Sequence, residues 1–160
     1  MAKVYVSSTR LDLEPERQAV IDWLIQADHQ PAHSYAADTQ TVRDGCLSDV
    51  RDCDAYVLIL GHRYGHVPAD GNPEQLSITE LEYREARDRL PVVVLTPKGV
   101  RDLSVTDINK PAYAKVAAFS AVVSARHKAC MFADDAELIA GLSCGLQKAL
   151  RGVPLADPAV

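Results

Sequence analysis

The sequence lacks three features that would each place it in a special class of protein. No run approaches eighteen consecutive apolar residues, so no transmembrane helix is expected. No cluster of Lys or Arg forms a basic stripe, and the formal net charge is -5, which disfavours a nucleic-acid surface. The first residues, MAKVYVSST, have the pattern of a strand and not of a signal peptide. What remains is a globular chain of 160 residues, the size of one domain, with 48% hydrophobic and 24% charged residues.

Cysteine is scarce, and its spacing carries no metal or disulfide signature. The four cysteines are Cys46, Cys53, Cys130 and Cys144, and no two of them form a C-x-x-C pair. Without a secretory signal, free buried thiols are expected in preference to disulfides, and the expected compartment is the cytoplasm.

Motifs that bind metals or cofactors are also missing. His62 and His66 have the spacing of a metal-binding pair, but Gly61 and Gly65 indicate a loop and no third ligand stands out. Neither a G-x-G-x-x-G pattern nor a Walker pattern occurs, which argues against a Rossmann dinucleotide site and a P-loop. We therefore expect no metal and no bound cofactor.

Short apolar runs alternate with helical patterns along the whole chain. The expected strands cover residues 3–6, 30–34, 55–60, 91–95 and 128–132. The expected helices cover residues 13–27, 42–53, 77–86, 111–126 and 135–150. Gly152 and Pro154 stop the last helix, so we expect one domain over residues 1–152 and a tail or linker over 153–160.

Strands separated by helices require crossover connections, which predict a parallel sheet with helices on both faces. Five such units predict an α/β fold, a three-layer flavodoxin-like sandwich with strand order 2-1-3-4-5. The run at residues 55–60 is apolar on both faces and is expected at the centre. In such sheets, ligands bind outside the carboxyl ends of the strands, where the strand order reverses.

Two segments are expected at that edge of the sheet. One holds four polar residues after the first strand, which could bind a phosphate or ribose or could cap the first helix: Ser7, Ser8, Thr9 and Arg10. The other is the long segment from Gly61 to Leu76, of which residues 62–76 are expected to form a mobile flap over a ligand. Within it, Arg63 offers an anion contact and Tyr64 a stacking surface, although a surface arginine and a core tyrosine explain them equally well.

The stretch SITELEYREA begins the third helix with an acid that has two interpretations. Ser77 and Glu80 form a capping box, in which the serine accepts from the Glu80 N–H and the carboxylate reaches back to the Ser77 N–H. Glu80 also flanks the sheet-facing stripe on the first turn after the long loop, so it could overhang a cleft and do chemistry there. The two roles are compatible.

Three motifs together resemble one family. They are KVYVSSTRLDLEPER at residues 3–17, CDAYVLILGHRYGHVP at residues 53–68, and SITELEYREA followed by PVVVL. They are similar to the TIR-like domain of unknown function 4062, which is common at the amino terminus of larger bacterial signalling and NTPase proteins. The similarity covers roughly residues 3–95, and the segment at 33–37 lacks the Met-Glu often found there.

The resemblance implies a function as well as a fold. TIR domains share the flavodoxin-like architecture, and many cleave NAD with a glutamate at the start of the helix after the third strand, where Glu80 stands. Nucleoside deoxyribosyltransferase relatives have a similar glutamate, but this chain has Glu82 in place of their glycine. By the same resemblance, Ser7, Ser8 and Arg10 would hold phosphate or ribose, and Tyr64 or Tyr83 would stack on a ring.

Three functions follow as hypotheses from the resemblance. The first is a TIR-like effector that hydrolyses NAD or a related nucleotide. The second is a non-catalytic interaction module that self-associates or docks onto further domains of a larger protein. The third is a nucleoside or nucleotide N-glycosidase or transferase that acts alone. None of them involves a nucleic acid or a membrane as partner.

Overall fold

The computed structural model describes residues 1–33, 42–69, 71–98 and 111–151. Its strands are β1 (Lys3–Ser8), β2 (Gln30–Ala32), β3 (Ala55–Ile59), β4 (Val92–Pro97) and β5 (Cys130–Phe132). Its helices are α1 (Arg10–Gln26), α2 (Val42–Arg51), α3 (Ile78–Ala86), α5 (Pro111–Arg126) and α6 (Asp135–Ala149). The five strands form one parallel sheet in the order β2-β1-β3-β4-β5, which confirms the predicted fold class and strand order.

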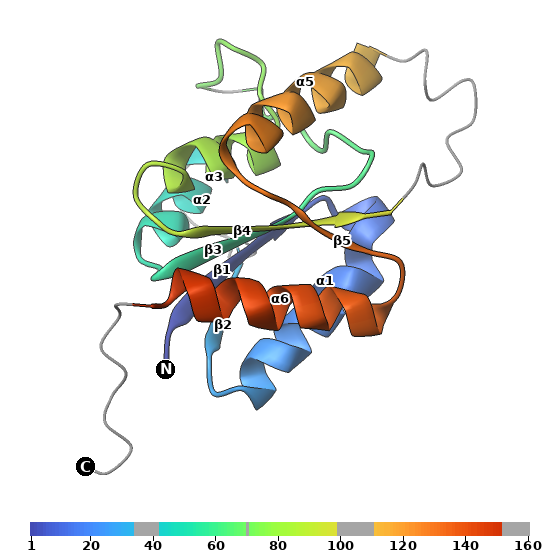
Figure 1. Ribbon diagram of the computed structural model, residues 1–160. Helices are drawn as coiled ribbons and strands as arrows, with labels where there is room; N and C mark the ends of the chain where they lie inside the picture. The colour runs from blue at the N-terminus through green and yellow to red at the C-terminus, as the bar shows by residue number, and fades with distance from the viewer. Residues whose placement is uncertain (34–41, 70, 99–110, 152–160) are drawn as a thin grey trace.

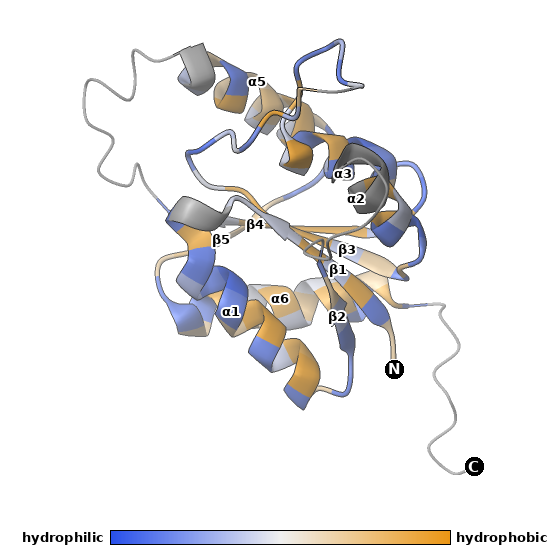
Figure 2. Cartoon of the chain, turned by 180° about the vertical axis from the view of Figure 1, so that it is seen from behind, coloured by the Kyte–Doolittle hydropathy of each residue, from blue (hydrophilic) through white to orange (hydrophobic). Residues whose placement is uncertain are grey.

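The sheet is the middle layer of three. Helices α1 and α6 cover one face, and α2, α3 and α5 cover the other (Figure 1). Every residue of β3 is buried, as expected for the central strand. Because side chains alternate along a strand, β3 sends Val57 and Ile59 toward α1 and α6, and Tyr56 and Leu58 toward the other helices. Figure 2 shows the matching hydrophobic stripes on the helices.

Helix α6 packs very close to the sheet because of two glycines. A Cβ on Gly145 would lie 2.6 Å from Cγ1 of Val93, and one on Gly141 would lie 3.0 Å from Cβ of Cys130. Leucines that share one face of α6 complete the contact and are buried: Leu138, Leu142 and Leu146. The helix begins at a capping aspartate, since Asp134 Oδ1 accepts from the N–H of Glu137 at 2.8 Å.

Helix α1 begins earlier than the sequence pattern predicts. It starts at Arg10 and not at Leu13, and Leu13 has non-helical backbone angles, φ −125° and ψ 16°. Pro15 follows two residues later. Proline lacks an N–H and its ring crowds the preceding turn, so the first turn is kinked against the rest of the helix. The kinked turn carries the chain from the end of β1 across the edge where ligands are expected.

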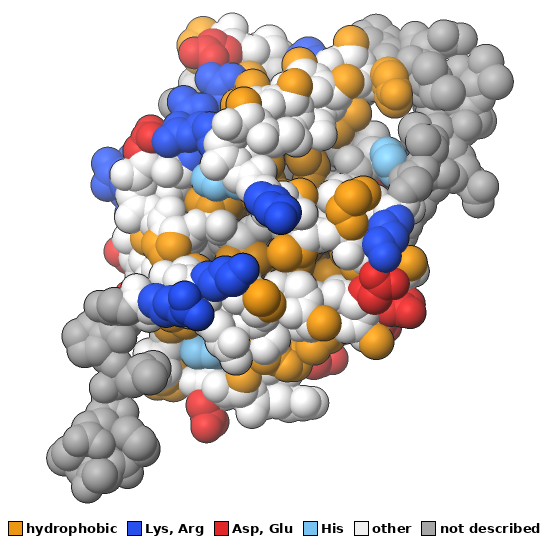
Figure 3. All heavy atoms as spheres, viewed as in Figure 1, with side chains coloured by type: hydrophobic (Ala, Val, Ile, Leu, Met, Phe, Trp, Pro, Cys, Tyr) orange, Lys and Arg blue, Asp and Glu red, His pale blue; other side chains and the backbone are white. Residues whose placement is uncertain are grey.

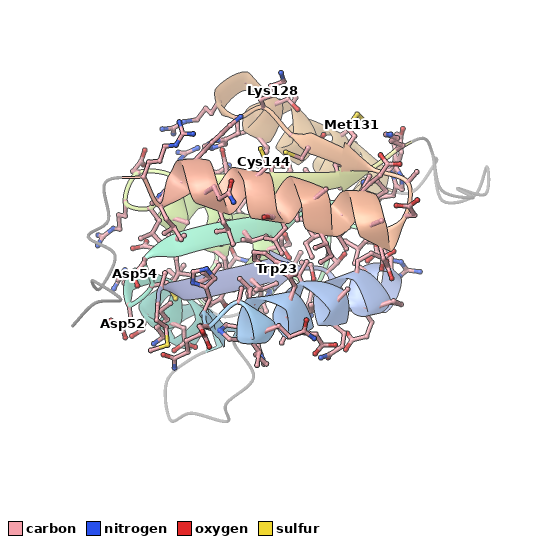
Figure 4. All side chains as sticks on the ribbon, turned by 60° about the horizontal axis from the view of Figure 1, so that its bottom comes forward. Trp23, Asp52, Asp54, Lys128, Met131 and Cys144 are labelled. Carbon is pink, nitrogen blue, oxygen red and sulfur yellow. The ribbon has the colours of Figure 1, made fainter. Side chains whose placement is uncertain are left out.

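The described residues include the side chains of three of the four cysteines and the turn between α2 and β3. Cys53, Cys130 and Cys144 are free thiols, whereas the side chain of Cys46 lies outside the described set. Asp54 accepts from the backbone N–H of Lys3 at 2.8 Å, a structural role at the junction of α2 and β3 (Figure 4). No helix in the described ranges combines the length and the hydrophobicity that crossing a bilayer requires. Residues 34–37 and 153–160 lie outside the description.

Candidate functional site

Helix α3 begins beside the carboxyl ends of β1 and β3, and its cap is the one predicted from the sequence. Ser77 is the N-cap, with φ −67° and ψ 158°, and its hydroxyl accepts from the N–H of Glu80 at 3.2 Å. The carboxylate of Glu80 does not complete the box in the expected way, because its oxygens face Tyr64 and Arg84. A backbone hydrogen bond from Ser77 instead reaches the hydroxyl of Tyr64 and lowers the pKa of that phenol.

Glu80 is buried and held on both oxygens. Oε1 accepts from the Tyr64 hydroxyl at 2.8 Å, and Oε2 accepts from Nε of Arg84 at 2.9 Å and lies 2.7 Å from its Nη2. Only 5% of Glu80 is exposed. Burial is the largest cause that raises the pKa of Tyr64, and the charge of Glu80 raises it further. Arg84 also reaches Glu74 at 3.3 Å, so Glu80 joins α3 to the loop that precedes it.

The end of β1 is lined by buried hydroxyls: Ser7 and Ser8 are the last residues of the strand and do not follow it as expected, and Thr9 is the N-cap residue of α1 without a side-chain capping bond. Ser7 donates to Oε1 of Glu82 at 3.1 Å, and Thr9 donates to the carboxylate of Asp12. Ser8 faces Arg17, whose Nη1 lies 3.4 Å from both the carbonyl oxygen and the hydroxyl of Ser8. These side chains are therefore engaged with the protein where a phosphate or ribose is expected.

Glu82 is the principal residue of this region that the sequence interpretation did not assign. Its carboxyl is 5% exposed and accepts from the hydroxyls of Tyr5 and Ser7. Burial raises its pKa from 4.5 to about 7, against the opposing effects of those two hydrogen bonds and of Arg17. The helical period gave only a weak signal: at about 100° per residue, position 82 borders one margin of the sheet-facing stripe and position 80 borders the other.

The remaining predicted site residues lie in different surroundings. Arg63 is exposed, and Arg10 opens α1 with a side chain outside the described set. Tyr83 is fully buried in the core, where its ring centroid lies 5.5 Å from that of Phe119 and 5.7 Å from that of His127. The structure thus places Ser7 against Glu82 of α3 and Ser8 against Arg17 of α1, and it places Tyr83 in the hydrophobic layer under α5.

The loop between β3 and α3 is braced by one side chain. Asn72 is 4% exposed. Its amide donates to the carbonyl oxygens of Pro68 at 3.0 Å and Leu76 at 2.8 Å, and its Oδ1 accepts from the Leu76 N–H at 3.1 Å. The Ile78 N–H bonds the carbonyl of His66 at 2.9 Å. This bracing argues against the mobile flap that the sequence predicts for residues 62–76.

A shallow cavity of about 210 Å³ lies on the outer side of α3, between that helix, α2 and the loop. Its lining residues are Leu47, Asn72, Pro73, Glu74, Leu76, Leu81, Arg84 and Glu85. Arg84 connects this cavity to Glu80, but neither Glu80 nor Glu82 is among the lining residues. The cavity is therefore separate from the end of β1.

A family model described as domain of unknown function DUF4062 matches residues 3–147. The chain belongs to the DUF4062 family. The membership expected from the motifs VSST, GHRYG and SITELEY is confirmed, and it extends through the final third of the chain, where the sequence alone gave only a strand and helix pattern. No curated protein matches the chain.

Two solved structures are similar to this DUF4062 domain. The CMP N-glycosidase BcmB of Clostridium botulinum is 10% identical, with a TM-score of 0.52 over 89% of this chain and 98% of that one. The TIR domains of the activated Roq1 resistosome, which recognises the pathogen effector XopQ, are 14% identical, with a TM-score of 0.45 over 98% of this chain and 92% of that one. At 10% identity, the similarity to the CMP N-glycosidase shows a shared fold and nothing more.

Proposed function

We propose that this DUF4062 domain binds a nucleotide over the ends of β1 and β3 and hydrolyses its N-glycosidic bond. The observation that carries the proposal is the set of buried carboxyl and hydroxyl groups at the edge where the strand order reverses. That edge is the usual ligand site of open parallel sheets. Ser7, Glu80 and Glu82 are all at least nine-tenths buried there.

One carboxylate is sufficient for this reaction when the substrate is NAD. The C1′–N bond breaks and its electron pair goes to the ring nitrogen of nicotinamide, which leaves uncharged without being protonated. Water supplies hydroxide to C1′, and its second proton is released. A carboxylate of α3 would stabilise the positive charge that develops on the ribose, by its charge and by hydrogen bonds to the ribose hydroxyls.

The motif resemblance makes Glu80 the first candidate for that carboxylate, with Ser7, Ser8 and Arg10 holding the ribose or phosphate. Tyr64 and Arg84 orient Glu80 in the free protein. The CMP N-glycosidase with a similar fold supports the same bond class, with cytidine monophosphate as an alternative substrate.

The test is to incubate the purified domain with NAD, or with cytidine monophosphate, at a high protein concentration and to measure free nicotinamide or cytosine. We expect base release that increases faster than linearly with protein concentration if activity requires self-association. A parallel incubation with a second free base detects transfer in place of hydrolysis. Absence of release from both nucleotides at every concentration contradicts the proposal.

A non-catalytic interaction module is the second candidate, and one surface favours it. The exposed residues of α5 include Lys115, Ser120, Ser124 and Arg126, but most of them are small and apolar: Ala114, Ala117, Ala118, Ala121, Val122 and Ala125. Figure 3 shows few charged side chains along this helix. Sedimentation of the domain over a range of concentrations tests this candidate, which requires association without base release.

A further inference from the structure

The polar cluster beneath the end of β1 is not required by the fold. Glu82 lies between α3 and the sheet, with its carboxyl against Tyr5 and Ser7. Burying a carboxyl is unfavourable, and here burial raises its pKa to about 7. A residue in such a position that is also surrounded by hydroxyls is a candidate for function, because perturbed carboxyls concentrate at functional sites.

Other elements direct polar groups to the same place. The hydroxyl of Tyr56, on β3, is buried and has no hydrogen-bond partner within the described residues, although Ser7 lies near enough to lower the pKa of this phenol. Burial, and then the charge of Glu82, raise that pKa well above its usual value. From α1, the charge of Arg17 lowers the pKa of Glu82, and from α2 that of Asp49 raises it. A cation, a carboxyl and several hydroxyls therefore converge on the end of β1.

Glu80 faces a different direction. Residues two apart on an α-helix are separated by about 200° around its axis, so their side chains do not meet. Glu80 contacts Tyr64 and Arg84 on the side of the loop, whereas Glu82 contacts β1. The strand order reverses between β1 and β3, so Glu82 is the carboxyl on the side where a ligand is expected.

We propose that Glu82 is the carboxyl that contacts the nucleotide, and that Arg17 binds a phosphate of the same ligand. This assignment rests on the proposed function and replaces Glu80 as the acid of the site. The ionised carboxylate of Glu82 accepts from a ribose hydroxyl and faces the positive charge at C1′ as the base leaves. The planar guanidinium of Arg17 matches two phosphate oxygens, so the preferred ligand is a nucleotide and not an uncharged nucleoside.

The experiment compares three single substitutions on one helix. Glu82→Gln, Glu80→Gln and the control Glu85→Gln are titrated with ADP-ribose and with cytidine monophosphate by calorimetry, and each variant is also melted. We expect Glu82→Gln to weaken binding by about tenfold or more, the fold-change of one charge-assisted hydrogen bond, without a lower melting temperature. Glu85→Gln should change affinity less than about twofold, which is below the effect of one neutral hydrogen bond, whereas a larger loss in Glu80→Gln than in Glu82→Gln returns the role to Glu80 and overturns the assignment.

Arg17 is tested by the charge of the ligand. Arg17→Gln should weaken binding of cytidine monophosphate by about tenfold more than it weakens binding of cytidine, because only the nucleotide loses a phosphate contact. Wild-type affinity in Glu82→Gln overturns the assignment, as does failure of the wild type to bind either nucleotide. Binding that depends on Glu82 without any base release supports the assignment and contradicts the proposed hydrolysis, so the two failures are distinguishable.

Discussion

The hydroxyl of Tyr64 donates to Oε1 of Glu80 at 2.8 Å, while Arg84 holds the other oxygen of the same carboxylate. The pair ties the GHRYG segment to the first turn of α3 across 16 residues of sequence. Tyr64, which the sequence predicts to stack on a base, thus holds Glu80 in place. Glu80, which the sequence predicts to do chemistry or to close a capping box, forms a structural brace between the loop and α3.

Glu80→Gln tests that brace by stability. Glutamine retains the N–H that Ser77 caps and a side-chain oxygen for Tyr64, but it loses the charge that pairs with Arg84. We expect a loss of about 1 kcal/mol in the free energy of unfolding, a modest value because the Arg84 side chain is 37% exposed. Urea unfolding of Glu80→Gln, Arg84→Gln and the double variant measures the coupling, and fully additive losses would contradict the brace.

The raised pKa of Glu82 predicts how stability depends on pH. Between 4.5 and about 7 the unfolded chain has lost a proton that the folded chain retains, so stability falls as the pH rises through this window. The full penalty, about 3 kcal/mol, applies above pH 7 and vanishes below 4.5. Glu82→Gln should therefore be more stable than wild type at about pH 8 and equal to it near pH 4.5. A constant difference between the two proteins at both pH values would rule out this titration.

Asn72→Ala should loosen the loop between β3 and α3. The substitution removes three hydrogen bonds from a buried side chain and leaves the carbonyl oxygens of Pro68 and Leu76 without this donor. We expect a loss of about 2–3 kcal/mol and faster proteolysis within the loop. Gln75→Ala is the matched control, since Gln75 makes a single side-chain bond to the Asn72 carbonyl at 3.0 Å. Equal proteolysis rates for the two variants would count against the special role of Asn72.

Gly145→Ala should weaken the contact between α6 and the sheet. The added methyl group would lie 2.6 Å from Cγ1 of Val93, closer than packed carbon atoms allow, so helix or strand must shift. The expected cost is about 1–3 kcal/mol, the usual range for overpacking, although alanine favours the helix. Cys144→Ala, at the exposed neighbouring position, is the control and should be nearly neutral. A Gly145→Ala variant as stable as wild type would indicate that α6 moves freely on β4.

The fold could be predicted from the sequence because short apolar runs and helical patterns alternate along the chain. The apolar run at β3 and the alternation of five strands with helices determine the layers and the strand order. The start of α1 could not be placed, because the kinked turn before Pro15 breaks the helical period at Leu13. A local sequence pattern predicts a regular helix or strand, but it does not predict where a kink interrupts that element.

The candidate site was predicted less completely, for a physical reason. The position of Ser7 follows from the end of a strand, and the cap at Ser77 follows from local spacing. The i,i+4 pair of Glu80 with Arg84 is local, but Tyr64 lies 16 residues from Glu80 and the partners of Glu82 lie more than 70 residues away, so only the tertiary structure shows which carboxyl faces β1. The helical period places positions 80 and 82 at opposite margins of the sheet-facing stripe and does not choose between them, and the VSST and SITELEY motifs directed attention to Glu80.

The two outer strands of the sheet, β2 and β5, have three residues each. A sheet edge that short exposes few unpaired backbone groups, so it is a poor template for adding a strand from another chain. Growth of the sheet from one molecule to the next is therefore disfavoured, and copies of this domain that assemble would have to meet through helices or loops. Such contacts depend on side chains, so single surface substitutions would be enough to prevent or to create them.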